Sequence, residues 1–243
     1  MKLFFDVGNS RAKWAAWDGR RWVAEGSIPT DADPPVHWIS AVPRPDAIWL
    51  ASVSAEERVL QISGACETAF GMSPQRIRAT ASACGVRCAY ADPSRLGVDR
   101  WLAVVAAFIE ARGSAIVFDC GTAITVDAVR ADGEHLGGLI IPGIALMRRA
   151  LYGSTANIPD EGDGDVGLLA RDTRSAVSGG SVYAAVAFMQ HVAAELRTHI
   201  GEKTRVLLTG GDAERLRPLL SPDFEWRPRL VLDGMRAVVE EKK

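Results

Sequence analysis

The chain has 243 residues, of which 48% are hydrophobic and 24% are charged, an ordinary composition for a globular protein with a substantial core. Its formal net charge of -2 provides no general attraction to nucleic acid or to an anionic membrane. No apolar stretch approaches the roughly 20 residues of a membrane span, and the first apolar run ends at Asp6, too early for a signal peptide. These features predict a cytoplasmic protein without a nucleic-acid or membrane partner.

The first predicted element is a strand that ends abruptly in polar residues. Residues 4–13 read FFDVGNSRAK, so an apolar run stops at Asp6 and is followed by Gly8, Asn9 and Ser10. A polar hairpin turn explains one such stretch equally well. The four cysteines are scattered, and no second Cys or His pair lies at zinc-ligand spacing from Cys84 and Cys88, so buried thiols are predicted.

The same pattern recurs 113 residues further along the chain. In residues 115–133 an apolar run reaches Asp119, Gly121 and Thr122, and each copy closes on an Asp-Gly turn, at 18–19 and 132–133. The repeat predicts duplicated halves, residues 1–112 and 113–243, although chance similarity of two hairpins remains an alternative.

Between the two copies the pattern predicts mixed α/β structure. We expect a buried strand over 47–54, a helix over 55–71, strand or loop over 75–80 and 85–92, and a helix from about Val98 with Asp99 in its first turn.

The second half continues the α/β pattern. We expect a strand, a Pro-Gly break and a helix over 136–153, followed by a mobile surface loop over 155–172. A long helix is expected over 173–201, interrupted or bent at Gly179–Gly180. A strand, a glycine turn and a helix should then occupy 204–220, and a strand and a helix should occupy 228–242.

The polar turns have the chemistry of a phosphate site. A glycine at a hairpin tip lets backbone amides approach a ligand, and those amides bind anionic oxygens. Two such tips facing each other would clamp a polyphosphate, and Gly210–Gly211, otherwise an ordinary strand–helix turn, would accept a base or ribose. Because the chain has neither the P-loop nor the dinucleotide fingerprint, the three motifs together predict another kind of nucleotide site.

The order of four motifs resembles one family. DVGNS (6–10), GVDR (97–100), DCGTAIT (119–125) and GGLIIPG (137–143) are similar to the type III pantothenate kinases of the actin/hexokinase-like superfamily. The resemblance implies an α/β fold with two ribonuclease H-like halves around a nucleotide cleft, and ATP-dependent phosphorylation of pantothenate in coenzyme A biosynthesis. It also implies Mg²⁺, a monovalent cation (K⁺ or NH₄⁺) and a homodimer.

The resemblance assigns roles residue by residue. It implies that the first phosphate loop consists of Asp6, Val7, Gly8, Asn9, Ser10, Arg11, Ala12 and Lys13, where the family usually has Thr in place of Ser10. It implies that ATP also contacts Thr122, that Asp119 binds the monovalent cation, and that Asp6 holds Mg²⁺ through water. It implies that pantothenate contacts Tyr90, Gly97, Val98, Asp99, Arg100 and Thr173, with Asp99 as the general base.

Alternatives remain open from the residues alone. Asp99 at a helix start is equally a carboxylate stabilised by the helix dipole, and Arg100 can clamp either a carboxylate or a phosphate. A regulatory protein related to accessory transcription factors, or another small-molecule kinase or hydrolase of the superfamily, would share the fold. The presence of Asp6, Asp99 and Asp119 together favours catalysis, since a regulator needs no base. The apolar stretches at 141–152 and 182–194 suggest a second copy as partner.

Overall fold

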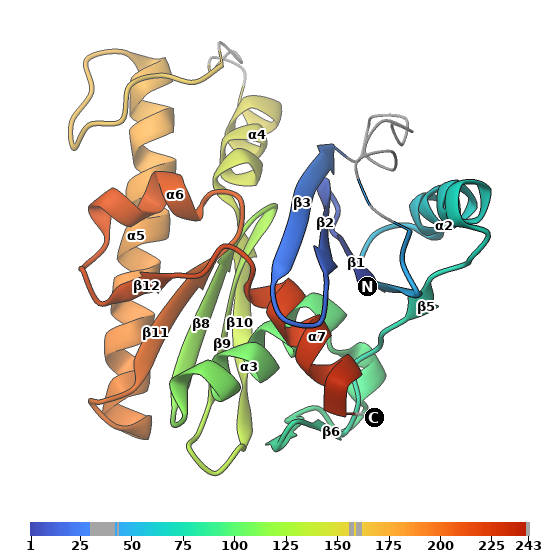
Figure 1. Cartoon of the computed structure of the whole chain (residues 1–243). Coiled ribbons are helices and arrows are strands. Elements are labelled where there is room, and N and C mark those ends of the chain that lie inside the picture. Colours follow the sequence, from blue (N-terminus) through green and yellow to red (C-terminus); the bar gives the residue numbers. More distant parts are fainter. Residues whose placement is uncertain (30–41, 43, 156–157, 159–161, 242–243) are drawn as a thin grey trace. The chain divides into compact units, whose positions relative to one another are not determined.

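The computed structural model describes residues 1–29, 42, 44–155, 158 and 162–241 (Figure 1). The chain forms two compact units, Met1–Ile109 with Arg229–Lys243, and Glu110–Pro228. The predicted division into halves, 1–112 and 113–243, remains a prediction; the compact units differ from it mainly because the C-terminal helix belongs to the first unit.

The first unit is built on a sheet of five strands in the order β3-β2-β1-β4-β5. Two antiparallel hairpin pairings join β1, β2 and β3, whereas β4 runs parallel to β1 and β5 runs parallel to β4. The strands are β1 (Lys2–Val7), β2 (Arg11–Trp17), β3 (Trp22–Pro29), β4 (Ala47–Ser52) and β5 (Gln75–Arg76).

The second unit repeats this arrangement with the order β10-β9-β8-β11-β12. Its first three strands are antiparallel, and β11 and β12 are parallel to β8, as in the first unit. The duplication inferred from the repeated Asp-x-Gly turn is therefore present in the topology. The strands are β8 (Ala115–Cys120), β9 (Ala123–Val129), β10 (His135–Pro142), β11 (Arg205–Thr209) and β12 (Phe224–Trp226).

Helices complete each unit. The first unit contains α2 (Glu56–Phe70), most of α3 (Val98–Ala111), α7 (Leu230–Glu241), the 3-10 turn η1 (Pro93–Arg95) and a small hairpin of β6 (Ser82–Ala83) and β7 (Val86–Arg87). The second contains α4 (Ile144–Ser154), α5 (Thr173–Ile200), α6 (Ala213–Leu216) and η2 (Arg217–Leu219). In the described part of the chain, no helix has the length and hydropathy needed to cross a membrane.

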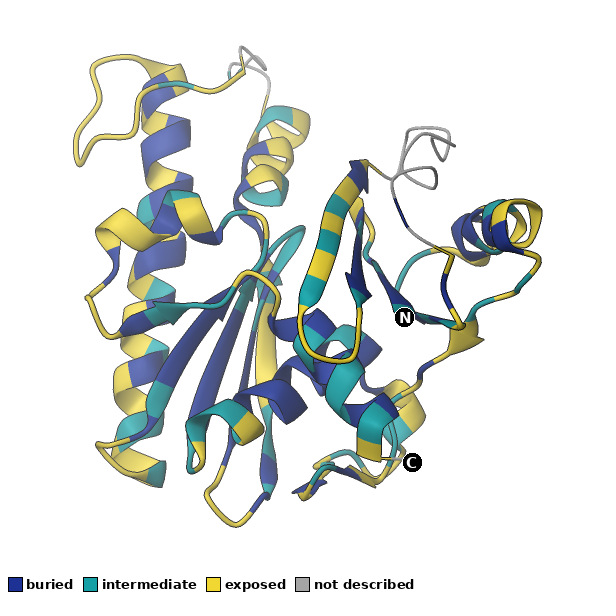
Figure 2. Ribbon diagram, viewed as in Figure 1, coloured by how far each residue is buried: buried dark blue, intermediate teal, exposed yellow. Residues whose placement is uncertain are grey.

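Each sheet is buried by its own hydrophobic core, and β8, β9 and β11 of the second unit are buried along most of their length (Figure 2). Trp14 and Trp101 are buried, whereas Trp17 is half-buried, and the Arg236 guanidinium lies 4.7 Å from its ring centroid. The cores include Leu3, Phe5, Ile48, Leu50 and Ile62 in the first unit, and Ile116, Phe118, Ile124, Val182 and Met189 in the second.

Both predicted Asp-Gly turns close hairpins. Gly19 has a φ of 104° and Gly133 has a φ of 83°, a region in which only glycine is unstrained. At the first turn the Asp18 side chain also accepts the backbone N–H groups of Arg20 and Arg21, at 2.7 and 2.8 Å. The residue types in these two turns were therefore sufficient to predict where the hairpins close.

The interruption predicted within the long helix is absent, and one predicted strand is wrong. Helix α5 continues without interruption through Gly179–Gly180, where the missing Cβ of Gly179 instead leaves room for the carbonyl oxygen of Gly167. The strand predicted at the start of 228–242 is instead the first turn of α7, because the apolar run at 230–232 is buried as part of a helix. The strand in this part of the chain is β12, which ends before that run.

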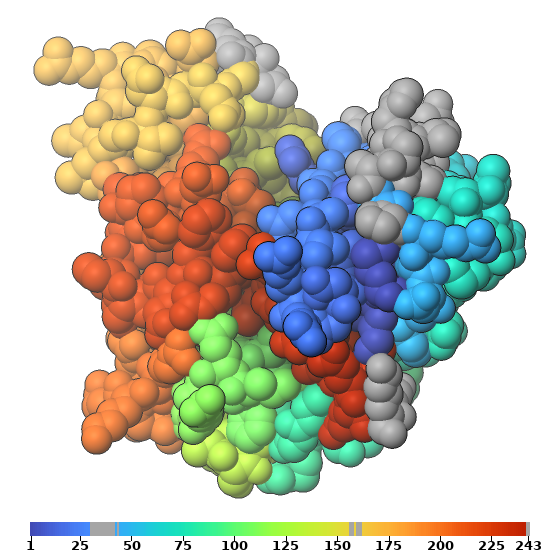
Figure 3. Space-filling model, viewed as in Figure 1, coloured from blue at the N-terminus to red at the C-terminus, as the bar shows by residue number. Residues whose placement is uncertain are grey.

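The loop predicted over 155–172 is only partly within the described residues. Residues 162–172 form neither helix nor strand, and most of them are exposed, drawn yellow in Figure 2; Figure 3 shows this part of the chain at the surface. Gly164 packs so closely on the start of α5 that a Cβ there would lie 2.6 Å from the Ser175 backbone nitrogen. The described part of the loop is therefore anchored on α5.

Candidate active site

The first polar tip is a tight turn between β1 and β2. The Gly8 N–H donates to the Arg11 carbonyl at 3.0 Å, and a Cβ on Gly8 would lie 3.2 Å from the same oxygen. Asn9 and Ser10 are exposed, and Asp6 stands opposite Lys13 in the strand register. The turn thus presents small hydrogen-bonding groups beside one carboxylate and one amine.

The end of β4 joins this tip, because β4 is parallel to β1 and its carboxyl end lies at the same edge of the sheet. The Val53 N–H donates to the Val7 carbonyl at 3.1 Å, and the Ser52 hydroxyl donates to the same carbonyl at 3.3 Å. The sequence alone suggested no role for Ser52 and Val53, although Ser52 ends β4 and Val53 follows it, a position where sites of parallel sheets commonly lie.

The Asp99 carboxylate turns back across Gly97. Its Oδ1 accepts the Arg100 N–H at 2.8 Å and lies only 2.7 Å from the position that a Cβ on Gly97 would occupy. The same Cβ position is 3.7 Å from Cγ1 of Val53. Gly97 therefore allows Asp99, the predicted base, to lie near Val53, whose N–H is hydrogen-bonded to the end of β1.

Arg100 and Tyr90, both predicted to contact the acceptor, contact each other. Arg100 is buried, and its Nη1 donates to the Tyr90 hydroxyl at 3.2 Å while the guanidinium lies 5.9 Å from the ring centroid. A buried guanidinium needs such partners to offset its lost hydration. The contact fixes the orientation of both side chains.

The second tip, which is the turn between β8 and β9, is covered by Pro142 and Gly143 at the end of β10. The Gly121 N–H donates to the Ala123 carbonyl at 3.0 Å, and the Gly143 N–H donates to the Thr122 carbonyl at 3.0 Å. A Cβ on Gly143 would lie 2.2 Å from the Gly121 carbonyl oxygen, so no other residue fits there without a backbone shift.

The Gly210–Asp212 turn, which follows β11, also packs against the second tip. Gly210 has a φ of 98°, and a Cβ there would lie 2.3 Å from the Cys120 carbonyl oxygen and 2.5 Å from Oδ1 of Asp119. The Asp212 N–H donates to the same carbonyl at 2.8 Å. Gly211, by contrast, is exposed with no atom within 4 Å of its Cβ position, so the open backbone surface lies there.

The second tip concentrates negative charge. Burial, and then the charges of Asp119 and Asp212, raise the pKa of the Cys120 thiol well above its usual value, so the thiol stays neutral. Burial alone raises the pKa of Cys66 to about 12. Within the described residues, no group of three or more His, Cys, Asp or Glu side chains is placed to hold a metal ion. A cation here would therefore need oxygen ligands from elsewhere, such as phosphate or water.

Thr173 belongs to the second unit, whereas the other predicted acceptor contacts belong to the first unit. It is the first residue of α5, is exposed, and follows Asp172, whose side chain accepts the Ser175 N–H at 2.8 Å as an N-cap. It lines a hollow of about 570 Å³ in the second unit, together with Leu151 and Val177. Tyr90 and Gly97–Arg100 belong to the first unit.

Two copies of one five-stranded sheet, each with a glycine turn after its first strand, define the actin-like and hexokinase-like class of ATPase folds. A protein-family model described as type III pantothenate kinase matches residues 2–195. The chain belongs to the type III pantothenate kinase family. The family resemblance and the fold class predicted from the sequence are confirmed, and the chain is an enzyme, a pantothenate kinase of coenzyme A biosynthesis.

Individual relatives agree with this assignment. The type III pantothenate kinase of Alkalilimnicola ehrlichii is 40% identical over 243 residues, covering 98% of each chain. A Campylobacter jejuni structure described as a Baf family transcriptional activator is 19% identical, with a TM-score of 0.61 over 99% of this chain and 98% of that one. Component A of the (R)-2-hydroxyglutaryl-CoA dehydratase of Acidaminococcus fermentans is 15% identical, with a TM-score of 0.53 over 100% and 99%. The last two likenesses show the fold alone, and the regulatory alternative is not favoured.

Substituting the two adjacent glycines separately should distinguish packing from open surface. Gly210→Ala places a methyl group against backbone at a positive φ, so we expect a loss of about 1–3 kcal/mol of stability and weaker nucleotide binding. Gly211→Ala should change both by little, because its Cβ position is open. Denaturant unfolding and nucleotide titration of both variants test this; equal effects at the two positions would contradict the packing described.

Proposed function

We propose that the enzyme transfers the γ-phosphoryl group of ATP to the primary hydroxyl of pantothenate, with Asp99 as general base. The observation that carries the proposal is the position of the Asp99 carboxylate, which lies across Gly97. Val53 lies beside Gly97, and its N–H donates to the Val7 carbonyl, where the first phosphate turn begins. Phosphoryl transfer needs a positioned alcohol whose proton is removed as the bond to phosphorus forms. A carboxylate that accepts the alcohol's hydrogen bond does both.

Residues of both polar turns are proposed to contact ATP. The tight Gly8 turn leaves amide donors and small side chains at its tip, which suits the oxygens of a polyphosphate. Arg11 and Lys13 supply positive charge on the following strand. The proposed ATP contacts are Asp6, Val7, Gly8, Asn9, Ser10, Arg11, Ala12, Lys13 and Thr122.

The acceptor is proposed to bind along the start of α3. The buried Arg100, oriented by the Tyr90 hydroxyl, has the chemistry to hold the pantothenate carboxylate through a charge-assisted hydrogen bond. Thr173 adds a hydroxyl at the N-terminus of α5. The proposed acceptor contacts are Tyr90, Gly97, Val98, Asp99, Arg100 and Thr173.

Mg²⁺ is proposed to sit near Asp6. The donor set fits this ion, because Mg²⁺ keeps several waters and is commonly held by one or two carboxylates plus substrate phosphates. The described residues offer single carboxylates here, not a metal cage. When bound, the ion would neutralise phosphate charge; Asp6 would hold it through water, and the backbone of the turn would hold the phosphate oxygens.

A monovalent cation, K⁺ or NH₄⁺, is proposed to bind at Asp119. The support is electrostatic: Asp119 and Asp212 both lie close enough to Cys120 to raise the pKa of its thiol. A triphosphate brought to two carboxylates would be repelled unless a cation intervened. We therefore expect activity to require K⁺ or NH₄⁺ in addition to Mg²⁺. Assays with K⁺, NH₄⁺ or Na⁺ as the only monovalent cation test this, and full activity in Na⁺ alone would contradict it.

A homodimer and a cytoplasmic location remain predictions. The apolar residues of 182–194 are largely used in the core of the second unit. Leu139 and Ile140 on β10 and Leu151 on α4 are instead 51%, 60% and 40% exposed, an apolar surface that a second copy would cover. Light scattering should give twice the chain mass of 26.1 kDa; a fully active monomer would be the opposing result.

The two carboxylates of the first unit should have separable roles. Asp99→Asn keeps size and one oxygen but cannot take up a proton, so turnover should fall by about 10²- to 10⁴-fold with ATP binding close to wild type. Asp6→Asn should instead alter the dependence on ATP and Mg²⁺, with pantothenate binding less affected. The measurement is ADP release with each substrate varied in turn.

Thermal melts of both variants provide the control, since neither carboxylate belongs to a hydrophobic core. Each variant should melt close to the wild type. Retention of most turnover by Asp99→Asn would leave Asp99 as a helix-terminal carboxylate and remove the base from the proposal.

A further inference from the structure

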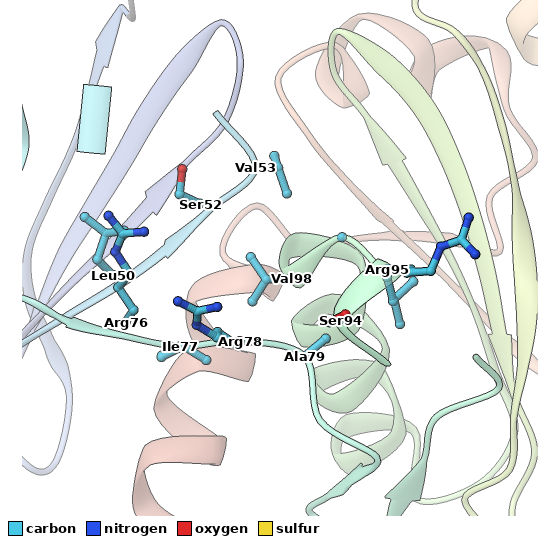
Figure 4. A pocket seen from close by; sticks show the side chains of 12 residues that line it. Leu50, Ser52, Val53, Arg76, Ile77, Arg78, Ala79, Ser94, Arg95 and Val98 are labelled. Carbon is cyan, nitrogen blue, oxygen red and sulfur yellow. The ribbon is translucent and has the colours of Figure 1, made fainter. Parts of the chain in front are cut away.

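Helix α4 carries a buried arginine that none of the roles above uses. The side chain of Arg148 is only 7% exposed, and Arg148 is one of three buried arginines among the described residues. Figure 4 shows arginines of another kind, which line a pocket beside the acceptor segment and are exposed to water: Arg76, Arg78 and Arg95. A guanidinium that has lost its water needs hydrogen-bond acceptors from the protein or from a ligand.

Two of the three nitrogens of the Arg148 guanidinium have no acceptor. Nη1 donates to Oδ1 of Asp163, whereas Nε and Nη2 are buried and make no hydrogen bond within the described part of the chain. Nε and Nη2 lie on one edge of the planar guanidinium, and their parallel N–H groups match two oxygens of one carboxylate or phosphate. The free edge of Arg148 is therefore a two-point donor for an oxyanion.

Tyr152 supplies a third donor on the same face of α4. It follows Arg148 by four residues, and side chains at this spacing lie one above the other on a helix. The Tyr152 hydroxyl is buried, and it too has no hydrogen-bond partner among the residues that the structure describes. All three atoms can donate, and a phosphate or a carboxylate has enough lone pairs to accept from each of them.

The charges that contact Arg148 also favour an anion. Arg215 on α6 donates to Oδ2 of Asp163 at 3.1 Å, so two guanidinium groups share one carboxylate. Asp163 is held in place through its neighbour Gly164, whose N–H donates to the Ser178 hydroxyl at 2.8 Å. The two arginines and the single aspartate leave one positive charge in excess, which one bound anion would neutralise.

We propose that Arg148 and Tyr152 form an oxyanion-binding site of the second unit, whose ligand is a small anion with a phosphate or a carboxylate group. The site is distinct from the substrate contacts proposed above, because neither residue is among them. The hollow beside Thr173 is lined by Leu151 but by neither Arg148 nor Tyr152. The inference concerns the second unit alone and does not depend on the proposed phosphoryl transfer.

An anion at this site would act on the helices that start at the second tip. Helix α4 begins directly after Gly143, whose N–H donates to the Thr122 carbonyl. Helix α6 follows the Gly210–Asp212 turn and is joined to α4 through the shared Asp163. Because the bound anion would neutralise the excess charge between Arg148 and α6, its occupancy would stabilise this connection by mass action.

Titration of the full chain with inorganic phosphate, without Mg²⁺ and at constant ionic strength, tests the site. The NMR signal of the Arg148 Nε–H group reports on the site itself and is assigned by its loss in Arg148→Lys. We expect a saturable shift of this signal, with binding roughly tenfold weaker in Tyr152→Phe, which removes the hydroxyl and keeps the ring. Arg149→Gln is the matched control, since it removes an exposed charge from the next position of α4 and should leave the affinity unchanged.

Three results would overturn the proposal. The first is the lack of a saturable shift with either phosphate or acetate, which would leave water as the partner of these donors. The second is equal affinity in Tyr152→Phe and Arg149→Gln, which would indicate non-specific attraction. The third is displacement of phosphate from Arg148 by ADP or by pantothenate, which would assign the side chain to a substrate. Acetate in place of phosphate distinguishes a carboxylate ligand from a phosphate ligand, and saturable binding of either supports the site.

Discussion

The arrangement of the site depends on one constraint: backbone segments approach each other more closely than a Cβ atom allows. At Gly143 and Gly210 a Cβ would lie 2.2 and 2.3 Å from a carbonyl oxygen of the second tip. At Gly97 it would lie 2.7 Å from the Asp99 carboxylate. The first two contacts fix the backbone around Asp119, and the third fixes the direction of a side chain. Packing against backbone therefore requires glycine at 143 and 210, whatever ligand binds, whereas at Gly97 the missing Cβ leaves room for the Asp99 carboxylate.

The duplicated sheet gives each unit the same turn in the same place but different neighbours. In the first unit the turn after β1 is joined by Val53, and Val53 is next to Gly97 and so to the acceptor segment. In the second unit the turn after β8 is enclosed by Gly143 and by Gly210. One topology thus supports two different surroundings: the carboxylate proposed as general base in one unit, and a carboxylate beside other negative charge in the other.

The sequence predicted features that depend on local chemistry and missed those that depend on tertiary contact. The polar turns that follow β1 and β8, and both Asp-Gly turns, follow from residue type, and each predicted strand end lies within one residue of the observed one. The start of α7 was assigned wrongly because a short apolar run does not distinguish a buried helix from a strand. The closeness of Gly210 to Asp119 joins segments distant in sequence, which no local pattern reveals.

The central claim is that Gly97 holds the Asp99 carboxylate in place for catalysis, and Gly97→Ala tests it most directly. The added methyl group meets the end of a flexible side chain, so the carboxylate should move while the fold stays intact. Steady-state turnover should fall on the order of 10²-fold, with the ATP dependence and the melting temperature unchanged. Gly64→Ala, at an exposed position in α2 with nothing within 4 Å, is the matched control and should keep full turnover. Wild-type turnover in Gly97→Ala would contradict the account.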